Sequence, residues 1–136
     1  FTHPASREVA RFVGSENIID GVVVASNGTC AVDAGGVRIR TRSPLTPEEL
    51  VSLCIRSEDL RVTPAGEATT APGKNTLPGI VTSIVPRGPF SRVTVDCGIT
   101  LSSILSWKVV DNLGIREGSH VAVSFAEESV HVVRRG

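Results

Sequence analysis

A motif of polar and apolar positions occurs twice along the chain and is its strongest structural signal. Residues 17–23 and residues 75–81 both read Asn, three variable residues, Gly and an apolar pair. Each copy is followed by Val-Asp-x-Gly, at residues 32–35 and at residues 95–98. A repeat of this length predicts two copies of one small β unit, which either pack on each other or exchange strands.

Both repeats consist of short apolar stretches separated by turn residues, which predicts about five strands in each. Residues 107–113 of the second repeat predict a helix, with Ser106 as its N-cap and Gly114 as its stop. The predicted fold is therefore all-β, with two tandem small OB-like β-barrel modules. The strands are expected at residues 18–25, 29–33, 37–41, 50–55 and 60–62, and at residues 76–85, 92–96, 100–105, 120–125 and 130–133.

A short helix is predicted ahead of the first repeat. Residues 4–13 place their apolar side chains on one helical stripe, with Pro4 in the first turn and Gly14 as the stop. Because the chain contains no Met and opens on Phe1, we expect it to be part of a longer polypeptide. The predicted organisation is a connecting helix at residues 1–14, a first β module at residues 15–63, a linker at residues 64–73 and a second β module at residues 74–136.

The charge balance argues against a nucleic-acid partner. The 136 residues include 14 Lys and Arg and 14 Asp and Glu, so no basic surface is expected for a phosphate backbone. Aromatic residues make up 4% of the chain and include no Tyr, which argues against a base-stacking surface. Cys30, Cys54 and Cys97 are widely spaced, which predicts buried free thiols in a reducing cytosol.

No catalytic or metal-binding pattern is found in the sequence. Neither repeat has its own nucleophile and base, and the sequence has no P-loop, so we do not expect this chain to be an enzyme. His3, His120 and His131 are scattered, and the last two are expected to face solvent. The two repeats carry matched acidic pairs, which are interpreted as solvated turns: Glu58 with Asp59, and Glu127 with Glu128. The repeated glycines are interpreted as bends: Gly21, Gly35, Gly79 and Gly98.

Several motifs resemble the C-terminal region of ABC importer ATPases. Residues 1–14 are similar to the segment that leaves the nucleotide-binding domain. Residues 55–60 resemble the I-R-P-E-D-I/L motif of the regulatory domains, with Ser57 in place of the usual Pro. The second repeat resembles the TOBE/MOP-like oxyanion-binding module through residues 75–79 and 93–98. Residues 113–118 and 130–132 match as well, and residues 16–21 are most similar to molybdate and tungstate importers.

The resemblance implies an oxyanion site in the second repeat, although several ligand positions differ. Family members begin this repeat with S-A-R-N, whose Ser and Arg contact the anion, whereas this chain has Pro72 and Lys74 there. The Ser that the family has in the helix is Val109 here. The family's Phe-Lys-Ala/Ser is Phe125-Ala126-Glu127, so Ala126 replaces the Lys and Glu127 adds a carboxylate. The residues still suited to an oxyanion are a cation, two strand hydroxyls and a helix-start hydroxyl: Lys74, Ser102, Ser103 and Ser106.

The resemblance implies a regulatory, dimerising C-terminal domain of an importer's ATP-binding subunit, most similar to the molybdate/tungstate type. Its partners are then a second copy, the upstream ATPase domain and the membrane permease, at the cytoplasmic face of the membrane. Molybdate or tungstate is the implied inhibitory ligand, and no other cofactor is expected. The lost ligand positions predict weak or absent binding. Two alternatives stay open: a free-standing oxyanion storage or sensor protein, and the regulatory domain of an importer for a sugar, a polyamine or iron.

Overall fold

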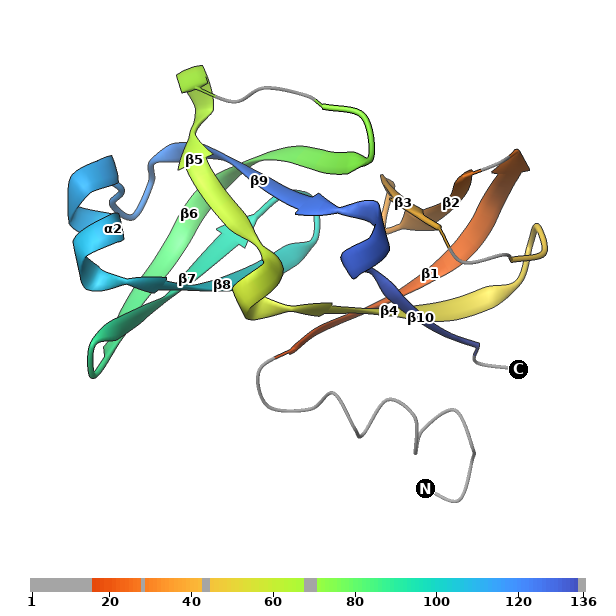
Figure 1. Cartoon of the computed structure of the whole chain (residues 1–136), viewed down its shortest axis with the longest axis horizontal. Helices are drawn as coiled ribbons and strands as arrows, with labels where there is room; N and C mark the ends of the chain where they lie inside the picture. The colour runs from red at the N-terminus through yellow and green to blue at the C-terminus, as the bar shows by residue number, and fades with distance from the viewer. Residues whose placement is uncertain (1–15, 28, 43–44, 68–70, 135–136) are drawn as a thin grey trace.

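The computed structural model describes residues 16–27, 29–42, 45–67 and 71–134, which are mostly β (Figure 1). None of the helices in these ranges is long and apolar enough to cross a membrane. The first repeat forms β1 (Glu16–Asn27), β2 (Thr29–Ala34), β3 (Val37–Thr41), β4 (Leu50–Arg56), the 3-10 helix η1 (Ser57–Asp59), β5 (Arg61–Pro64) and the 3-10 helix η2 (Ala65–Glu67). The second forms β6 (Lys74–Arg87), β7 (Phe90–Asp96), β8 (Thr100–Ser106), α2 (Trp107–Leu113), β9 (His120–Ala126), η3 (Glu127–Ser129) and β10 (His131–Arg134).

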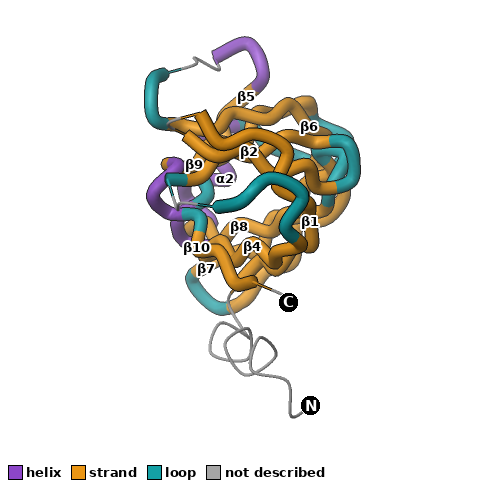
Figure 2. Tube along the Cα trace, turned by 90° about the vertical axis from the view of Figure 1, so that its right-hand side faces the viewer, coloured by secondary structure: helices purple, strands orange, loops and turns teal. Residues whose placement is uncertain are grey.

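The strands form two five-stranded antiparallel sheets, and each repeat gives its last strand to the other sheet. The strand orders are β10-β4-β1-β2-β3 and β5-β9-β6-β7-β8. β5 of the first repeat pairs with β9, and β10 of the second repeat pairs with β4. Of the two arrangements that the repeat allowed, the chain therefore has the strand exchange. Figure 1 shows the sheets next to each other along the long axis, and Figure 2 views them along that axis.

One hydrophobic core joins the two sheets. The apolar ladders of β4 and β9 supply much of it, and Leu53, Ile55, Val123 and Phe125 are each 3% exposed or less. Val62 of the exchanged strand β5 lies opposite Val123 and is also buried. Burying one such side chain contributes roughly 1.5–3 kcal/mol. The strand exchange therefore places apolar surface of one repeat in the core of the other, which ties the two repeats together.

Gly21 and Gly79 occupy equivalent positions at which one strand passes close to its neighbour. A Cβ on Gly21 would lie 2.6 Å from Val32 Cγ1 and 2.8 Å from the Asp33 carbonyl oxygen. A Cβ on Gly79 would lie 2.6 Å from Val95 Cγ1. In both strands the register shifts shortly after the glycine. The glycine of the repeated motif is therefore needed for close packing, which confirms its structural interpretation.

The predicted helix at residues 107–113 is confirmed together with both of its ends. The Ser106 hydroxyl accepts a hydrogen bond from Val109 N at 3.2 Å, and Gly114 adopts the left-handed conformation with a φ of 67°. Each of the ten strands in the described ranges matches a predicted strand, mostly with longer bounds. Part of the predicted linker is structured, because β5 extends to Pro64 and η2 follows it. The predicted N-terminal helix lies outside the described residues, and the module boundaries stay a prediction.

Candidate functional site

The two sheets meet at two equivalent junctions, each closed by the Asn of the repeated motif. At the Asn17 junction, Asn17 accepts a hydrogen bond from Ser102 N (2.7 Å) and donates to the Ser102 carbonyl (2.9 Å). At the Asn75 junction, Asn75 accepts from Arg40 N (2.8 Å) and donates to the Arg40 carbonyl (2.9 Å). Each amide thus pairs with the backbone of an edge strand, β8 or β3, as a further strand would. The Asn of the motif therefore holds the two repeats together.

A buried hydroxyl beside each junction follows the same symmetry. The Ser103 hydroxyl donates to the Leu60 carbonyl at 2.9 Å, and the Thr41 hydroxyl donates to the Val130 carbonyl at 3.3 Å. Leu60 and Val130 directly follow η1 and η3. The two hydroxyls therefore tie each edge strand to the turn that leads into the exchanged strand. Ser103, one of the predicted oxyanion ligands, uses its hydroxyl proton within the fold.

The Asn75 junction also carries charge. The Glu127 carboxylate lies 3.3 Å from Arg40 Nε and 3.7 Å from Arg42 Nε. The Glu127 side chain is 5% exposed, whereas those of Arg40 and Arg42 are 51% and 64% exposed. The prediction that Glu127 belongs to a solvated turn is therefore wrong. The turn η3 directs this side chain toward β3, where two guanidinium groups compensate for the loss of hydration.

The corresponding positions of the Asn17 junction carry no charge. Its buried turn residue is Ser57, which is 1% exposed. The Ser57 hydroxyl forms no hydrogen bond with any residue that the structure describes. Strand register and turn alignment show which residues of the two junctions are equivalent. Arg40 corresponds to Ser102, Arg42 to Ile104 and Glu127 to Ser57.

A cleft of about 210 Å³ lies beside the Asn75 junction. Two cations line it, Arg61 of β5 and Lys74 of β6, together with the hydroxyls of Ser124 and Ser129. Cations and hydroxyl donors are the groups that bind small oxyanions in proteins. A carboxylate, Asp59, lies on the same lining and opposes an anion. The cleft therefore suits a small anion, with one unfavourable charge; the remaining lining residues are Phe125 and Ala126.

The structure places the four predicted site residues at three different locations. Lys74 lines the cleft, and its carbonyl accepts a hydrogen bond from Arg40 Nη2. Ser102 belongs to the Asn17 junction together with Ser103, and Ser106 caps α2. Figure 1 shows α2 at one end of the molecule, far from the start of β6. A single chain therefore does not bring Lys74 together with the three serines.

Arg61 is the cation of the cleft that the sequence analysis missed. It lies on β5 opposite Ser124 of β9, and Lys74 lies opposite Ala126 on the other side of the same strand. The strand exchange brings Arg61 there, because β5 belongs to the first repeat in sequence. The sequence did indicate that Arg61 faces outward, because it precedes the apolar Val62 and side chains alternate along a strand.

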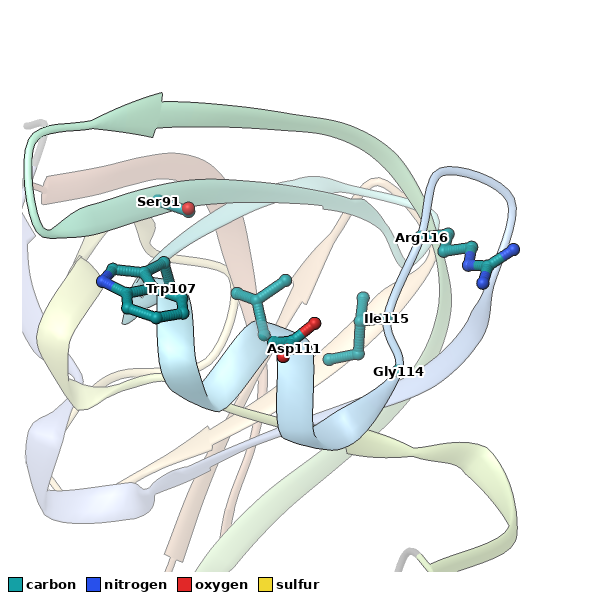
Figure 3. A pocket seen from close by; sticks show the side chains of 7 residues that line it. Ser91, Trp107, Asp111, Gly114, Ile115 and Arg116 are labelled. Atoms are coloured by element: carbon teal, nitrogen blue, oxygen red, sulfur yellow. The ribbon is translucent and has the colours of Figure 1, made fainter.

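A second hollow, of about 380 Å³, lies beside α2 and offers less to an anion. Figure 3 shows Trp107 and Asp111 on α2 near this hollow, whereas the Arg116 side chain extends away from both. The Asp111 carboxylate repels an anion, and the Ser106 hydroxyl is already occupied by the helix start. We therefore consider the cleft of Arg61 and Lys74 the better candidate site.

The histidines and cysteines of the described ranges are also candidate ligands. No group of three His, Cys, Asp or Glu residues there is placed to hold a metal ion. His120 and His131 are exposed, as expected. Cys30 and Cys54 are buried free thiols, as predicted, whereas Cys97 is only partly buried. Burial, and secondarily the charge of Asp96, raises the pKa of the Cys97 thiol from 9.0 to about 11.

Comparisons with known proteins identify the family. The profile of the TOBE domain matches residues 53–133. The chain belongs to the TOBE domain family. It is 35% identical over 133 residues to the molybdate/tungstate import ATP-binding protein WtpC of Pyrococcus abyssi, covering 97% of this chain and 36% of WtpC. WtpC of Pyrococcus horikoshii is 36% identical over 136 residues with the same coverages.

Two further comparisons broaden the picture of this TOBE domain. The spermidine/putrescine import ATP-binding protein PotA of Nitratidesulfovibrio vulgaris is 37% identical over 106 residues, covering 75% of this chain and 27% of PotA. The chain thus spans about a third or less of the length of these curated relatives. The solved structure of ModG, described as a cytoplasmic molybdate-binding protein with molybdate bound, has a TM-score of 0.77. ModG is 17% identical to this chain, and the match covers 95% of ModG and 87% of this chain. This likeness confirms the predicted fold class.

Proposed function

We propose that this TOBE domain is the regulatory C-terminal domain of the ATP-binding subunit of an ABC importer for molybdate or tungstate. One observation carries the proposal: the similarity to two WtpC proteins extends over 97% of the chain. The chain has no P-loop, so ATP hydrolysis would belong to another part of the subunit. The domain would then lie at the cytoplasmic face of the membrane, held there by the ATPase domain and the permease.

The ligand of the regulatory site would be an oxyanion in the cleft of Arg61 and Lys74. Two unit charges about 4 Å apart interact by about 4 kcal/mol at an effective dielectric constant of 20. Two cations against the single carboxylate of Asp59 therefore leave a net attraction for an anion. Ala126 supplies no charge at the position where family members have Lys, so binding should be weak. This balance supports an anion site of low affinity.

Regulation requires an anion that binds differently to two arrangements of the transporter. Lys74 lines the cleft, whereas Ser106 caps α2 at the far end of the molecule, so only a second copy of the chain could bring Ser106 to an anion bound at Lys74. We propose a homodimer with the second repeat at its interface. Light scattering tests this part of the proposal. A mass that stays at the 14.3 kDa of one chain at high concentration would contradict it.

Calorimetric titration with molybdate, tungstate, sulfate and spermidine tests the proposed ligand. We expect weak binding of molybdate and tungstate and none of spermidine. Lys74→Ala should weaken oxyanion binding at least tenfold. Lys108→Ala is the matched control, because Lys108 is the other lysine of the chain and lies at α2. Equal effects of the two substitutions would show that the oxyanion is not held in the cleft.

Two other functions are each supported by one comparison. The fold covers 95% of ModG, which supports a free-standing molybdate storage or sensor protein. The similarity to PotA supports the regulatory domain of a polyamine importer. The same titrations separate these candidates, since tight molybdate binding by this chain favours storage, whereas the importer domain should bind it weakly. Binding of spermidine favours the polyamine importer.

A further inference from the structure

The charged group at the Asn75 junction is not required by the shared scaffold. The Asn17 junction has the same pair of Asn–backbone hydrogen bonds and the same buried hydroxyl, yet its equivalent turn residue is Ser57. A buried serine therefore fills the position that Glu127 fills at the other junction. The two guanidinium groups and the buried carboxylate are therefore specific to the Asn75 junction, and assembly of the two repeats does not explain them.

The two guanidinium groups at this junction are accessible although their carboxylate is not. Arg40 and Arg42 each direct Nε toward Glu127, and their side chains remain more than half exposed. A guanidinium group has five N–H donors, and a single carboxylate cannot use all the donors of two such groups. Solvent therefore reaches cationic donors that lie around a buried negative charge. An occupied anion site has the same arrangement, except that here the anion is the carboxylate of a protein side chain.

We propose that Arg40 and Arg42 form a second oxyanion site, which Glu127 occupies from within. In this proposal the Glu127 carboxylate is the resident anion, and it excludes a free tetrahedral oxyanion by occupying the cations and by repulsion. Glu127 is thus a specificity-determining residue. Neither Arg40 nor Arg42 lines the cleft of Arg61 and Lys74, so the two sites are separate. Each site can fail without the other.

The test is calorimetry with molybdate and with sulfate at low ionic strength on the whole chain and its variants. Glu127→Gln keeps the shape of the side chain and removes its charge, and should tighten molybdate binding at least tenfold. Glu128→Gln is the matched control, because Glu128 follows directly in η3 and is exposed. It removes the same formal charge without freeing the guanidinium groups, and should leave the affinity within about twofold, as expected for an exposed and screened charge.

Adding Arg42→Gln to Glu127→Gln should remove the gained affinity, while Lys74→Ala should leave most of it in place. This contrast separates the inference from the proposed cleft. Glu127→Ser, which copies the equivalent Ser57, is the second variant in case Glu127→Gln does not fold. Equal affinities of folded Glu127→Gln and Glu128→Gln proteins would overturn the proposal. Failure of both Glu127 variants to fold would also overturn it, because the charge would then be a requirement of the fold.

Discussion

The two junctions between the sheets share one framework but differ in chemistry. At each junction, a buried Asn forms hydrogen bonds with the backbone of an edge strand, and a hydroxyl of that strand donates to the carbonyl of the residue after a 3-10 turn. The Asn17 junction has no charge at the positions equivalent to Arg40, Arg42 and Glu127, whereas the Asn75 junction places the two arginines around the carboxylate. The repeated motif thus encodes assembly of the two repeats, and the residues outside the motif carry the charges.

This difference shows which parts of a duplicated fold can change. The Asn amides are the hydrogen-bond partners of backbone N–H and carbonyl groups, so losing the amide at either junction would lower the free energy of unfolding. The amides bond only the backbone of Arg40 and Ser102, so the side chains at these two positions are free to differ. Charge can therefore accumulate at one junction while the other stays neutral. The candidate anion cleft lies beside the charged one.

The largest expected effect is the loss of either Asn. Asn17→Ala and Asn75→Ala should each lower the free energy of unfolding by about 2–4 kcal/mol, because each leaves a backbone N–H and a carbonyl without partners. Urea unfolding followed by circular dichroism measures both losses. A loss of less than about 0.5 kcal/mol in one variant alone, well below the cost of an unpaired buried group, would show that only one junction supports the fold.

The next effect concerns the glycines of the motif. Gly21→Ala and Gly79→Ala should each cost roughly 1–3 kcal/mol, because the added Cβ has no room between the strands. Gly66→Ala is the control, since no described atom beyond its chain neighbours lies within 4 Å of a Cβ at that position. Thermal unfolding of the three variants gives the comparison. If Gly66→Ala destabilises as strongly as the other two, close packing is not the reason for the glycines.

A smaller difference between the repeats should be visible only at alkaline pH. Cys97 corresponds to Ala34 in the first repeat, and its pKa is raised from 9.0 to about 11. The unfolded thiol ionises from about pH 9, while the folded thiol stays neutral, so the folded state loses stability between pH 9 and pH 11. Melting temperatures of the parent and of Cys97→Ala should diverge in that window. Parallel curves would contradict the raised pKa.

The smallest expected effect is that of Arg42→Gln on stability. The guanidinium group is largely exposed and lies 3.7 Å from Glu127, which also has Arg40 at 3.3 Å. Exposed ion pairs contribute about 0–1 kcal/mol, so the loss should stay below about 1 kcal/mol. It should shrink further in about 1 M salt because of screening. A loss of several kcal/mol that salt does not change would mean that Arg42 is part of the required framework.

Much of the fold could be predicted from the sequence, because short-range patterns specify it. The repeat, the alternating ladders and the capped helix at Trp107–Leu113 each follow from local residues. The burial of Glu127 could not be predicted, because the arginines that neutralise it come from a strand far away in sequence. Arg61 was missed for the same reason, since strand exchange brings it to Lys74. Lys74 and the three serines were grouped because they retain the cation and hydroxyls of a family site, and the structure of one chain has them at three separate locations.

The groups suited to an anion lie on the Asn75 side of the molecule. Titration of isotope-labelled protein with molybdate, followed by amide chemical shifts in NMR spectra, locates the bound anion because it detects weak binding at each residue. We predict the largest shifts at Arg61, Lys74, Ser124 and Ser129, with little change at Ser57 and Asn17. Shifts centred on Ser102, Ser103 and Ser106, or no shifts at saturating molybdate, would contradict the account.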